Sequence, residues 1–295
     1  MPPSTLIAWL GDPSCLDAAL VGGKSANLSR LASSALVPPG FCLTIEAHAA
    51  WAPFLLQDNP IATPEGLPEA FVSAVRLAHS ALSERCQASL PVLAVRSSGV
   101  DEDGAEASFA GLFHTCLNVR GVEALLQAIT RCWSSAEEAR VLEYRAHRGL
   151  APGGLAVLVQ EMVPADAAAV VFSRHPVGSA DGILINANYG IGESLVSGTT
   201  NPDTWILRRS DLSIMRTVIG EKATMTVPDG KVGTRDVPVL RTLRQRACLT
   251  PQHVESLGRL ALKLEATMGW PVDLECAFHR ENLYLLQCRP ITTSR

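Results

Sequence analysis

Apolar and polar residues follow two periods along the first part of the chain, one typical of strands and one of helices. The expected strands are short apolar or β-rich runs, at residues 92–95, 155–163, 168–173 and 183–186. Helical spacing predicts a helix after Lys24 and two longer ones, at about 69–89 and 122–147. Residues 1–200 are therefore expected to alternate helices and strands as one larger lobe.

The pattern changes from about Asn201 onward. A strand around 205–207 precedes a turn-rich stretch that contains Pro228-Asp229-Gly230, and a helix is expected at 250–268. Two strands follow, 272–279 and 283–288, joined by a short turn. Residues 201–295 are therefore expected to form a second, smaller α+β lobe.

Composition and charge argue against nucleic acids and membranes as binding partners. The formal net charge is −4, which gives no broad basic surface for nucleic acid or an anionic membrane. No apolar run reaches the roughly 18 residues that span a bilayer, and the opening Met-Pro-Pro-Ser-Thr lacks the layout of a secretory signal. We expect a cytoplasmic protein with no nucleic-acid or membrane partner. Its 8 cysteines are scattered, which favours reduced thiols over disulfides or zinc.

Lys24 follows two glycines at the start of a predicted helix. A cation there opposes the helix dipole, because the unpaired N–H groups already make that end positive. An anion held jointly by those N–H groups and Lys24 would remove the conflict. The alternative is an exposed lysine after a glycine turn.

Arg96 directly follows the apolar run at 92–95. Its guanidinium could clamp phosphate oxygens, or it could form a salt bridge to Asp101 or Asp103. Farther on, Ser108-Phe109-Ala110-Gly111 and Thr115 supply small residues and a hydroxyl suited to close approach over a phosphate chain. The same segment could equally be a tight turn.

Polar side chains alternate along the two last strands. Period-two spacing puts Asp273 and Glu275 on one face, and likewise Gln287 and Arg289. If the strands form a hairpin, a carboxylate, a carboxamide and a guanidinium converge, and oxygen ligands of this kind suit Mg²⁺. The alternative is a surface ion pair between Glu275 and Arg289.

Two further segments carry weaker signals. The run Gln160-Glu161-Met162-Val163 ends a strand before Pro164, where a hinge between lobes could offer backbone groups to a purine edge while Met162 packs on the ring. A plain buried strand end fits equally well. His175 precedes a proline in a loop, which favours a structural role over a nucleophilic one.

Taken in order, seven segments resemble the ATP-binding domain shared by phosphoenolpyruvate synthase, pyruvate phosphate dikinase and rifampicin phosphotransferase. The resemblance covers about Val21 to Thr292. The matching stretches are Gly22-Gly23-Lys24-Ser25-Ala26-Asn27-Leu28, Val37-Pro38-Pro39-Gly40-Phe41, Val95-Arg96-Ser97-Ser98, Ser108-Phe109-Ala110-Gly111, Val159-Gln160-Glu161-Met162-Val163, Asn188-Tyr189-Gly190-Ile191-Gly192-Glu193 and Leu286-Gln287-Cys288-Arg289-Pro290-Ile291-Thr292.

This resemblance implies an α+β, ATP-grasp-type fold of two lobes with the nucleotide in the cleft between them. It implies that ATP and Mg²⁺ are bound, with Glu275 and Gln287 near the metal. Lys24, Arg96 and Arg289 are the implied catalytic cations. The implied nucleotide-binding residues are Lys24, Arg96, Gly111, Thr115, Gln160, Glu161, Met162, Val163, Glu275, Gln287 and Arg289.

The family's reaction sets the expected partners. Such enzymes cleave ATP to AMP and phosphate and move a phosphoryl or pyrophosphoryl group to a histidine on a separate swivelling domain. Nothing in this sequence resembles the Gly-rich Thr-Ser-His stretch that carries that histidine. A separate phosphohistidine-domain protein is therefore the first expected partner. Leu112 also stands where the family often has a glutamine.

Two other functions compete with this one. The chain could be a self-sufficient kinase or ATP-dependent ligase that acts on a small molecule in a specialised biosynthetic pathway. It could instead be a non-catalytic nucleotide sensor. Retention of Lys24, Glu275 and Arg289 disfavours the sensor.

Overall fold

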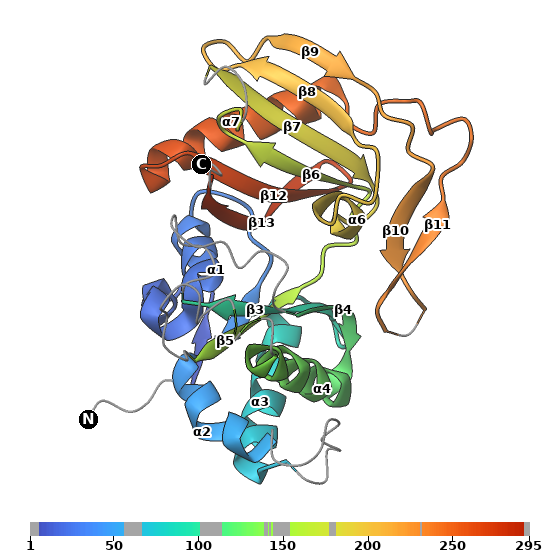
Figure 1. Ribbon diagram of the computed structural model, residues 1–295. Helices are drawn as coiled ribbons and strands as arrows, with labels where there is room; N and C mark the ends of the chain where they lie inside the picture. Colours follow the sequence, from blue (N-terminus) through green and yellow to red (C-terminus); the bar gives the residue numbers. More distant parts are fainter. Residues whose placement is uncertain are drawn as a thin grey trace. The chain divides into compact units, whose positions relative to one another are not determined.

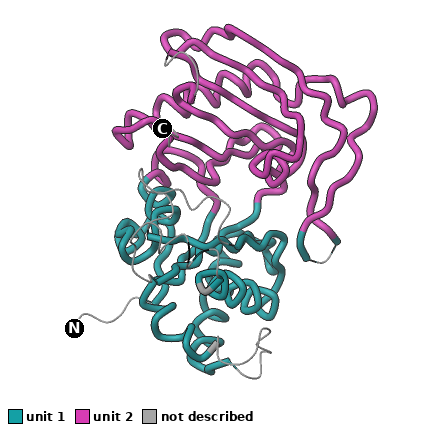
Figure 2. Tube along the Cα trace, in the orientation of Figure 1, with its two compact units in different colours: residues 1–30, 39–162, 230–233 teal, residues 31–38, 163–229, 234–295 magenta. Residues whose placement is uncertain are grey.

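The computed structural model describes residues 6–55, 67–100, 114–138, 141, 143, 154–176, 181–230 and 232–291. Contacts divide the chain into two compact units (Figures 1 and 2). Unit 1 comprises residues 1–30, 39–162 and 230–233, and unit 2 comprises residues 31–38, 163–229 and 234–295. Gly111 lies outside the described residues, as do Asp101, Asp103 and Leu112.

Unit 1 is built on a five-stranded sheet in which all neighbouring strands are antiparallel. From one edge to the other, its strands are β1 (Ile7–Trp9), β2 (Gly40–Leu43), β5 (Leu155–Glu161), β3 (Val92–Gly99) and β4 (Thr115–Arg120). β3 extends beyond the predicted 92–95, because it pairs with β4 on one side and with β5 on the other.

Helices cover both faces of this sheet. Alternate residues of β2 and β5, such as Phe41 and Val157, form the larger core with α2 (Ile45–Leu55), α3 (Glu69–Arg85) and α4 (Gly121–Ser134). Trp133 completes this core, and its indole N–H donates to Leu155 O at 2.8 Å. The intervening residues Cys42 and Ala156 pack instead with α1 (Ala18–Leu31). Strand alternation thus assigns each helix to a face.

Unit 2 is built on a six-stranded antiparallel sheet. Its strands run in the order β13 (Asn282–Pro290), β12 (Val272–His279), β6 (Ala167–Phe172), β7 (Gly182–Tyr189), β8 (Asp203–Arg208) and β9 (Ile214–Val218).

The long helix α7 (Pro251–Met268) crosses one face of this sheet (Figure 1). It begins at Thr250, whose side chain accepts a hydrogen bond from His253 N, and it ends at Gly269, which adopts a left-handed conformation with φ 77°. Within the described residues, no helix is both long and apolar enough to cross a membrane.

Short elements complete the chain. β10 (Thr224–Pro228) and β11 (Thr234–Pro238) form a hairpin separate from the large sheet. The short helices are α6 (Glu193–Val196), η1 (Pro13–Leu16) and η3 (Ser135–Glu137). The first half of the helix predicted at 122–147 corresponds to α4, which ends at Ser134 and is followed by η3. Most of 139–147 lies outside the described residues.

The division into units differs from the expected boundary at residues 200 and 201. That position lies between β7 and β8, which pair directly in one sheet. The chain instead leaves unit 1 after Met162, next to the hinge predicted at Pro164. The change in sequence pattern near Asn201 therefore corresponds to the connection between two strands of unit 2. Local sequence pattern does not show which strands pair, so it could not distinguish this connection from a domain boundary.

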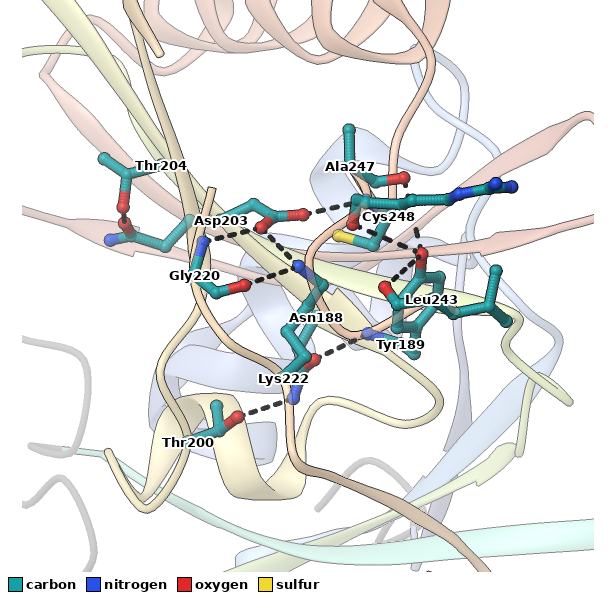
Figure 3. Close-up of polar contacts among 12 residues, drawn as sticks. Asn188, Tyr189, Thr200, Asp203, Thr204, Gly220, Lys222, Leu243, Ala247 and Cys248 are labelled. Carbon is teal, nitrogen blue, oxygen red and sulfur yellow. Dashed lines mark hydrogen bonds and ion pairs between the residues drawn. The ribbon is translucent and has the colours of Figure 1, made fainter. Parts of the chain in front are cut away.

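A buried ion pair ties irregular segments to the sheet of unit 2 (Figure 3). Lys222 Nζ lies 2.5 Å from Asp203 Oδ1, and both side chains are 0% exposed. Lys222 also donates to Gly220 O at 2.9 Å. Asp203 accepts further bonds from Gly220 N at 2.9 Å and Cys248 N at 2.8 Å. Both charges are thus satisfied inside the protein.

Candidate functional site

The glycine pair before Lys24 interrupts α1. Gly22 has φ 75° and ψ 163°, a non-helical conformation inside the helix. A Cβ placed there would lie 2.1 Å from Ser98 O. Gly22 is therefore required because α1 approaches the end of β3 at this point, whether or not an anion also binds.

Hydrogen bonds of serine hydroxyls and of Lys24 hold α1 against the end of β3. Ser98 Oγ donates to Val21 O at 2.8 Å and accepts from Ser25 N at 3.2 Å. Lys24 Nζ donates to Ser97 O at 2.9 Å, and the residue is 6% exposed. The alternative of an exposed loop lysine is therefore wrong. An ammonium has three N–H donors, so this bond is compatible with phosphate binding.

The strand register brings the other predicted residues of unit 1 together. Arg96 on β3 lies opposite Thr115 on β4 and Leu158 on β5. Gln160 follows Leu158 by two positions and therefore points to the same face. Arg96, Thr115 and Gln160 thus share one face of the sheet.

This shared face is the one that α1 covers in part. Leu158 lies opposite Cys42 on β2, and Cys42 packs with Val21 and Ala26 of α1. Lys24 belongs to the same helix. Unit 1 therefore presents an ammonium, a guanidinium, a hydroxyl and a carboxamide on one side of its sheet.

The segment from Glu161 to Val163 connects the two units. Glu161 N donates to Pro39 O at 2.9 Å and Met162 N donates to Val92 O at 2.8 Å. Met162 and Val163 are 9% and 7% exposed. The backbone N–H groups of Glu161 and Met162 are thus already used, so purine recognition by these two residues would depend on their carbonyl groups. That recognition stays a prediction.

The side chain of Glu161 belongs to the opposite face. Glu161 lies opposite Leu93, which packs in the larger core. Burial raises the pKa of its carboxyl, and a hydrogen bond with Cys86 offsets this in part. The structure gives this side chain no place among Arg96, Thr115 and Gln160.

In unit 2, the predicted hairpin of the last two strands is confirmed. Asp273 lies opposite Arg289, and Glu275 lies opposite Gln287. Arg289 Nε donates to Asp273 Oδ2 at 2.8 Å. The residue directly opposite Arg289 is thus Asp273 and not Glu275, which the sequence had suggested as the ion-pair partner.

Burial and charge act in opposite directions on Asp273, which is 5% exposed. Burial raises the pKa of its carboxyl, the Arg289 guanidinium lowers it and the neighbouring Glu275 carboxylate raises it, so that the net pKa is above the ordinary value. The sequence placed Asp273 on the right face but gave it no role in the site.

The polar residues lie on the face of the sheet away from α7. Gly258 of α7 sits against Leu207 and Ile183. Following the register across β7, β6 and β12 places Leu274 on that same face. Asp273 and Glu275, on either side of Leu274, therefore point to the opposite face, together with Gln287 and Arg289.

Two further polar residues, Asn186 and Thr204, share this face and were missed from the sequence. The register places Asn186 opposite Val170, which in turn lies opposite Glu275. Thr204 Oγ1 donates to Asn186 Oδ1 at 2.9 Å. The alternation in Ile185-Asn186-Ala187 could have indicated Asn186, but only the strand order shows that it lies in the row of Glu275.

The oxygen atoms on this face fit Mg²⁺. A carboxylate and a carboxamide oxygen, from Glu275 and Gln287, lie opposite each other, and Asp273 is next to them. Mg²⁺ is usually held by one or two carboxylates, with water and substrate phosphates in its other positions. Among the described residues there is no group of three or more His, Cys, Asp or Glu that could hold a metal by itself. This set therefore suits a metal that arrives with a phosphate ligand.

The chain is similar to known proteins over nearly its whole length. The family model described as the pyruvate phosphate dikinase AMP/ATP-binding domain matches residues 61–295. A probable phosphoenolpyruvate synthase of Methanocaldococcus jannaschii is 34% identical over 97% of this chain and 27% of its own length. The prodigiosin synthesizing transferase of Serratia marcescens is 34% identical over 98% of this chain and 33% of its own length.

A third relative is named as a phosphotransferase. The rifampicin phosphotransferase of Streptomyces sviceus is 33% identical over 93% of this chain and 34% of its own length. The chain thus spans about a third of the length of these curated relatives. The similarity concerns one part of larger enzymes.

Proposed function

Since this chain belongs to the family of the pyruvate phosphate dikinase AMP/ATP-binding domain, we propose that it is an ATP-dependent phosphotransferase of the phosphoenolpyruvate synthase type. It binds Mg²⁺-ATP and supplies a phosphoryl group to a histidine on a separate partner protein. AMP and inorganic phosphate are the other products.

The observation that carries this proposal is the register of β12 and β13. It sets Asp273 opposite Arg289 and Glu275 opposite Gln287 on the face of the unit 2 sheet that points away from α7. Oxygen ligands for a divalent cation and a fork-shaped phosphate donor thus occupy adjacent positions. Packing of the sheet alone does not require these polar groups, two of which, Asp273 and Gln287, are 5% and 7% exposed.

Each group has a chemical task in phosphoryl transfer. Lys24, Arg96 and Arg289 neutralise charge on the phosphate oxygens as the transferring group separates from its leaving group. Glu275 and Gln287 would hold the metal, which would supply positive charge to offset that of the phosphate groups. Asp273 holds the Arg289 guanidinium in position through its hydrogen bond.

The overall step balances as a reaction of ATP, water and the acceptor imidazole. ATP is cleaved to AMP, one phosphoryl group forms a bond to a histidine nitrogen, and water takes the other phosphoryl group as inorganic phosphate. The imidazole N–H proton is released. No side chain of this chain needs to form a covalent bond, so positioning and charge neutralisation are the protein's contribution.

A direct small-molecule kinase or ligase is the second candidate. The names of two relatives favour it, because a rifampicin phosphotransferase and a prodigiosin synthesizing transferase both denote action on specialised small molecules. In that case one small acceptor would restore turnover without a second protein.

Phosphorus-31 NMR distinguishes the two. Purified protein is incubated with Mg²⁺ and ATP, with either the protein fraction or the small-molecule fraction of a source-cell extract. AMP that forms only with the protein fraction supports the histidine partner. Nucleotide product formed with the small-molecule fraction alone replaces that proposal with the second candidate. A parallel incubation with the Arg289→Ala variant separates turnover by this chain from turnover by extract enzymes.

A further inference from the structure

Unit 2 contains a polar cavity that the nucleotide-binding residues do not line. Its volume is about 220 Å³. The lining residues come from α6, the segment after it, and the hairpin of β10 and β11: Glu193, Ser194, Ser197, Thr199, Thr226, Thr234, Arg235 and Asp236.

The motif Asn188-Tyr189-Gly190-Ile191-Gly192-Glu193 builds one wall of this cavity. Gly190 has φ 75°, and a Cβ there would lie 2.4 Å from Thr226 O. Ile191 N donates to that same carbonyl at 3.0 Å. The glycine thus lets the hairpin approach closely, and this approach places Thr226 beside Glu193 and Ser194.

The polar atoms of the cavity are mostly hydrogen-bond acceptors. Thr226 Oγ1 donates to Asp236 Oδ1 at 2.7 Å, and Thr234 Oγ1 donates to Glu193 Oε2 at 2.5 Å. Each hydroxyl proton is thereby directed to a carboxylate, and the hydroxyl lone pairs remain as acceptors. Such a wall is complementary to a ligand that brings its own O–H or N–H donors.

Ser194 adds an independent sign of a ligand. The residue is 7% exposed, and its hydroxyl has no hydrogen-bond partner within the described part of the chain. A buried hydroxyl without a partner is unfavourable by about 1–3 kcal/mol. Because Ser194 lines the cavity, a molecule bound there could satisfy it.

The charge of the lining selects against phosphates. Glu193 and Asp236 contribute two carboxylates to the lining, and Arg235 contributes one guanidinium. The Arg235 guanidinium is partly neutralised, because its Nε lies 3.3 Å from Asp229 Oδ1. The excess of carboxylates disfavours an anion. We propose that this cavity binds a small, phosphate-free molecule rich in hydroxyl or amino donors, between glycerol and a hexose in size.

Saturation-transfer NMR on the full chain tests this proposal without any need for ATP turnover. The probes are glycerol, glucose and glucosamine, with glucose 6-phosphate as the anionic counterpart. We expect binding of at least one phosphate-free probe and no binding of glucose 6-phosphate. Stronger binding of glucosamine than of glucose would identify an amine ligand, and equal binding would identify a polyol.

Variants locate the binding. Ser194→Ala removes a hydroxyl that bonds to no described group, so the protein should keep its melting temperature while the affinity for the probe falls by about 3- to 10-fold. Glu193→Gln should abolish any preference for glucosamine. Ser256→Ala is the control, because its hydroxyl donates to His253 O on α7 and does not line the cavity.

Three results would overturn the proposal. The first is the absence of binding by all three phosphate-free probes. The second is binding that is equal in Ser194→Ala, Glu193→Gln and the control, which would place the probe elsewhere. The third is binding of glucose 6-phosphate as tight as that of glucose, which would contradict the charge argument.

Discussion

Two aspartates in the same sheet form ion pairs that differ in burial. Asp203 on β8 is paired with Lys222, and both side chains are 0% exposed. Asp273 on β12 is paired with Arg289, whose side chain is 28% exposed. The first pair is enclosed by backbone groups that complete its hydrogen bonds. The second lies on the face away from α7, beside Glu275 and Gln287.

The two pairs differ in whether the cation can reach a ligand. A buried pair that is fully hydrogen-bonded can hold a fold in one arrangement, but it cannot reach a ligand. An arginine that is partly exposed can exchange its contacts for phosphate oxygens. We therefore propose that Asp203 and Lys222 serve stability, whereas Arg289 and Asp273 serve nucleotide binding.

The largest expected effect is on stability. Lys222→Met leaves the Asp203 carboxylate buried without its cation, which should lower the free energy of unfolding by about 3–5 kcal/mol. Urea denaturation measures this. The control is Lys263→Met, because Lys263 is an exposed residue that donates to Ser34 O, and it should change stability little. If Lys222→Met and Lys263→Met lowered stability equally, the buried pair of Asp203 and Lys222 would have no special structural role.

The next effect is on nucleotide affinity. Arg289→Ala should weaken Mg²⁺-ATP binding by about 10- to 100-fold, since charge-assisted hydrogen bonds contribute about 1.5–3 kcal/mol each. Isothermal titration calorimetry measures the affinity. Arg289→Lys should recover only part of it, because an ammonium lacks the planar fork. Wild-type affinity in Arg289→Ala, with a normal melting temperature, would contradict the assignment.

A smaller effect is expected at the metal ligands. Glu275→Gln replaces a carboxylate by a carboxamide and should raise the Mg²⁺ concentration needed for half-maximal ATP binding by about tenfold. The matched control is Glu255→Gln on α7, where the carboxylate pairs with Arg259 on the surface. A metal requirement unchanged by Glu275→Gln would move the metal site away from the hairpin.

The smallest effect concerns pH. Burial raises the pKa of Asp273 above its ordinary value despite Arg289, so the folded state binds this proton more tightly than the unfolded state. Its contribution to stability is therefore present at low pH and is lost as the pH rises from the ordinary aspartate pKa through the raised folded one. Asp273→Asn should remove this loss. Melting temperatures of both proteins across the mildly acidic range measure it, and parallel curves would refute it.

Much of the fold could be predicted from local patterns. The hairpin of β12 and β13, the helix α7 and most strands of unit 2 correspond to runs with a clear period. The strands that were missed include β1 and β9. β1 is only 3 residues long, and every residue of β9 is exposed, so neither shows the apolar alternation of a half-buried strand.

The candidate site was likewise predicted only in part from the sequence. Spacing alone placed Glu275 with Asp273, and Gln287 with Arg289, because side chains two apart on a strand share a face. It could not show that Arg289 meets Asp273, since this depends on the register between the two strands. It gave no sign of the pair of Asp203 and Lys222, because Lys222 lies in an irregular segment with no period.

The sequence by itself thus determined the elements, the family motifs and the face that each strand residue occupies. The tertiary structure decided which faces meet: it set Gly22 against Ser98, Arg96 beside Thr115, and Glu275 in one row with Asn186. The physical reason is one of range. Local periodicity follows from backbone geometry within a few residues, whereas strand order and register follow from burial and hydrogen bonding summed over the whole sheet.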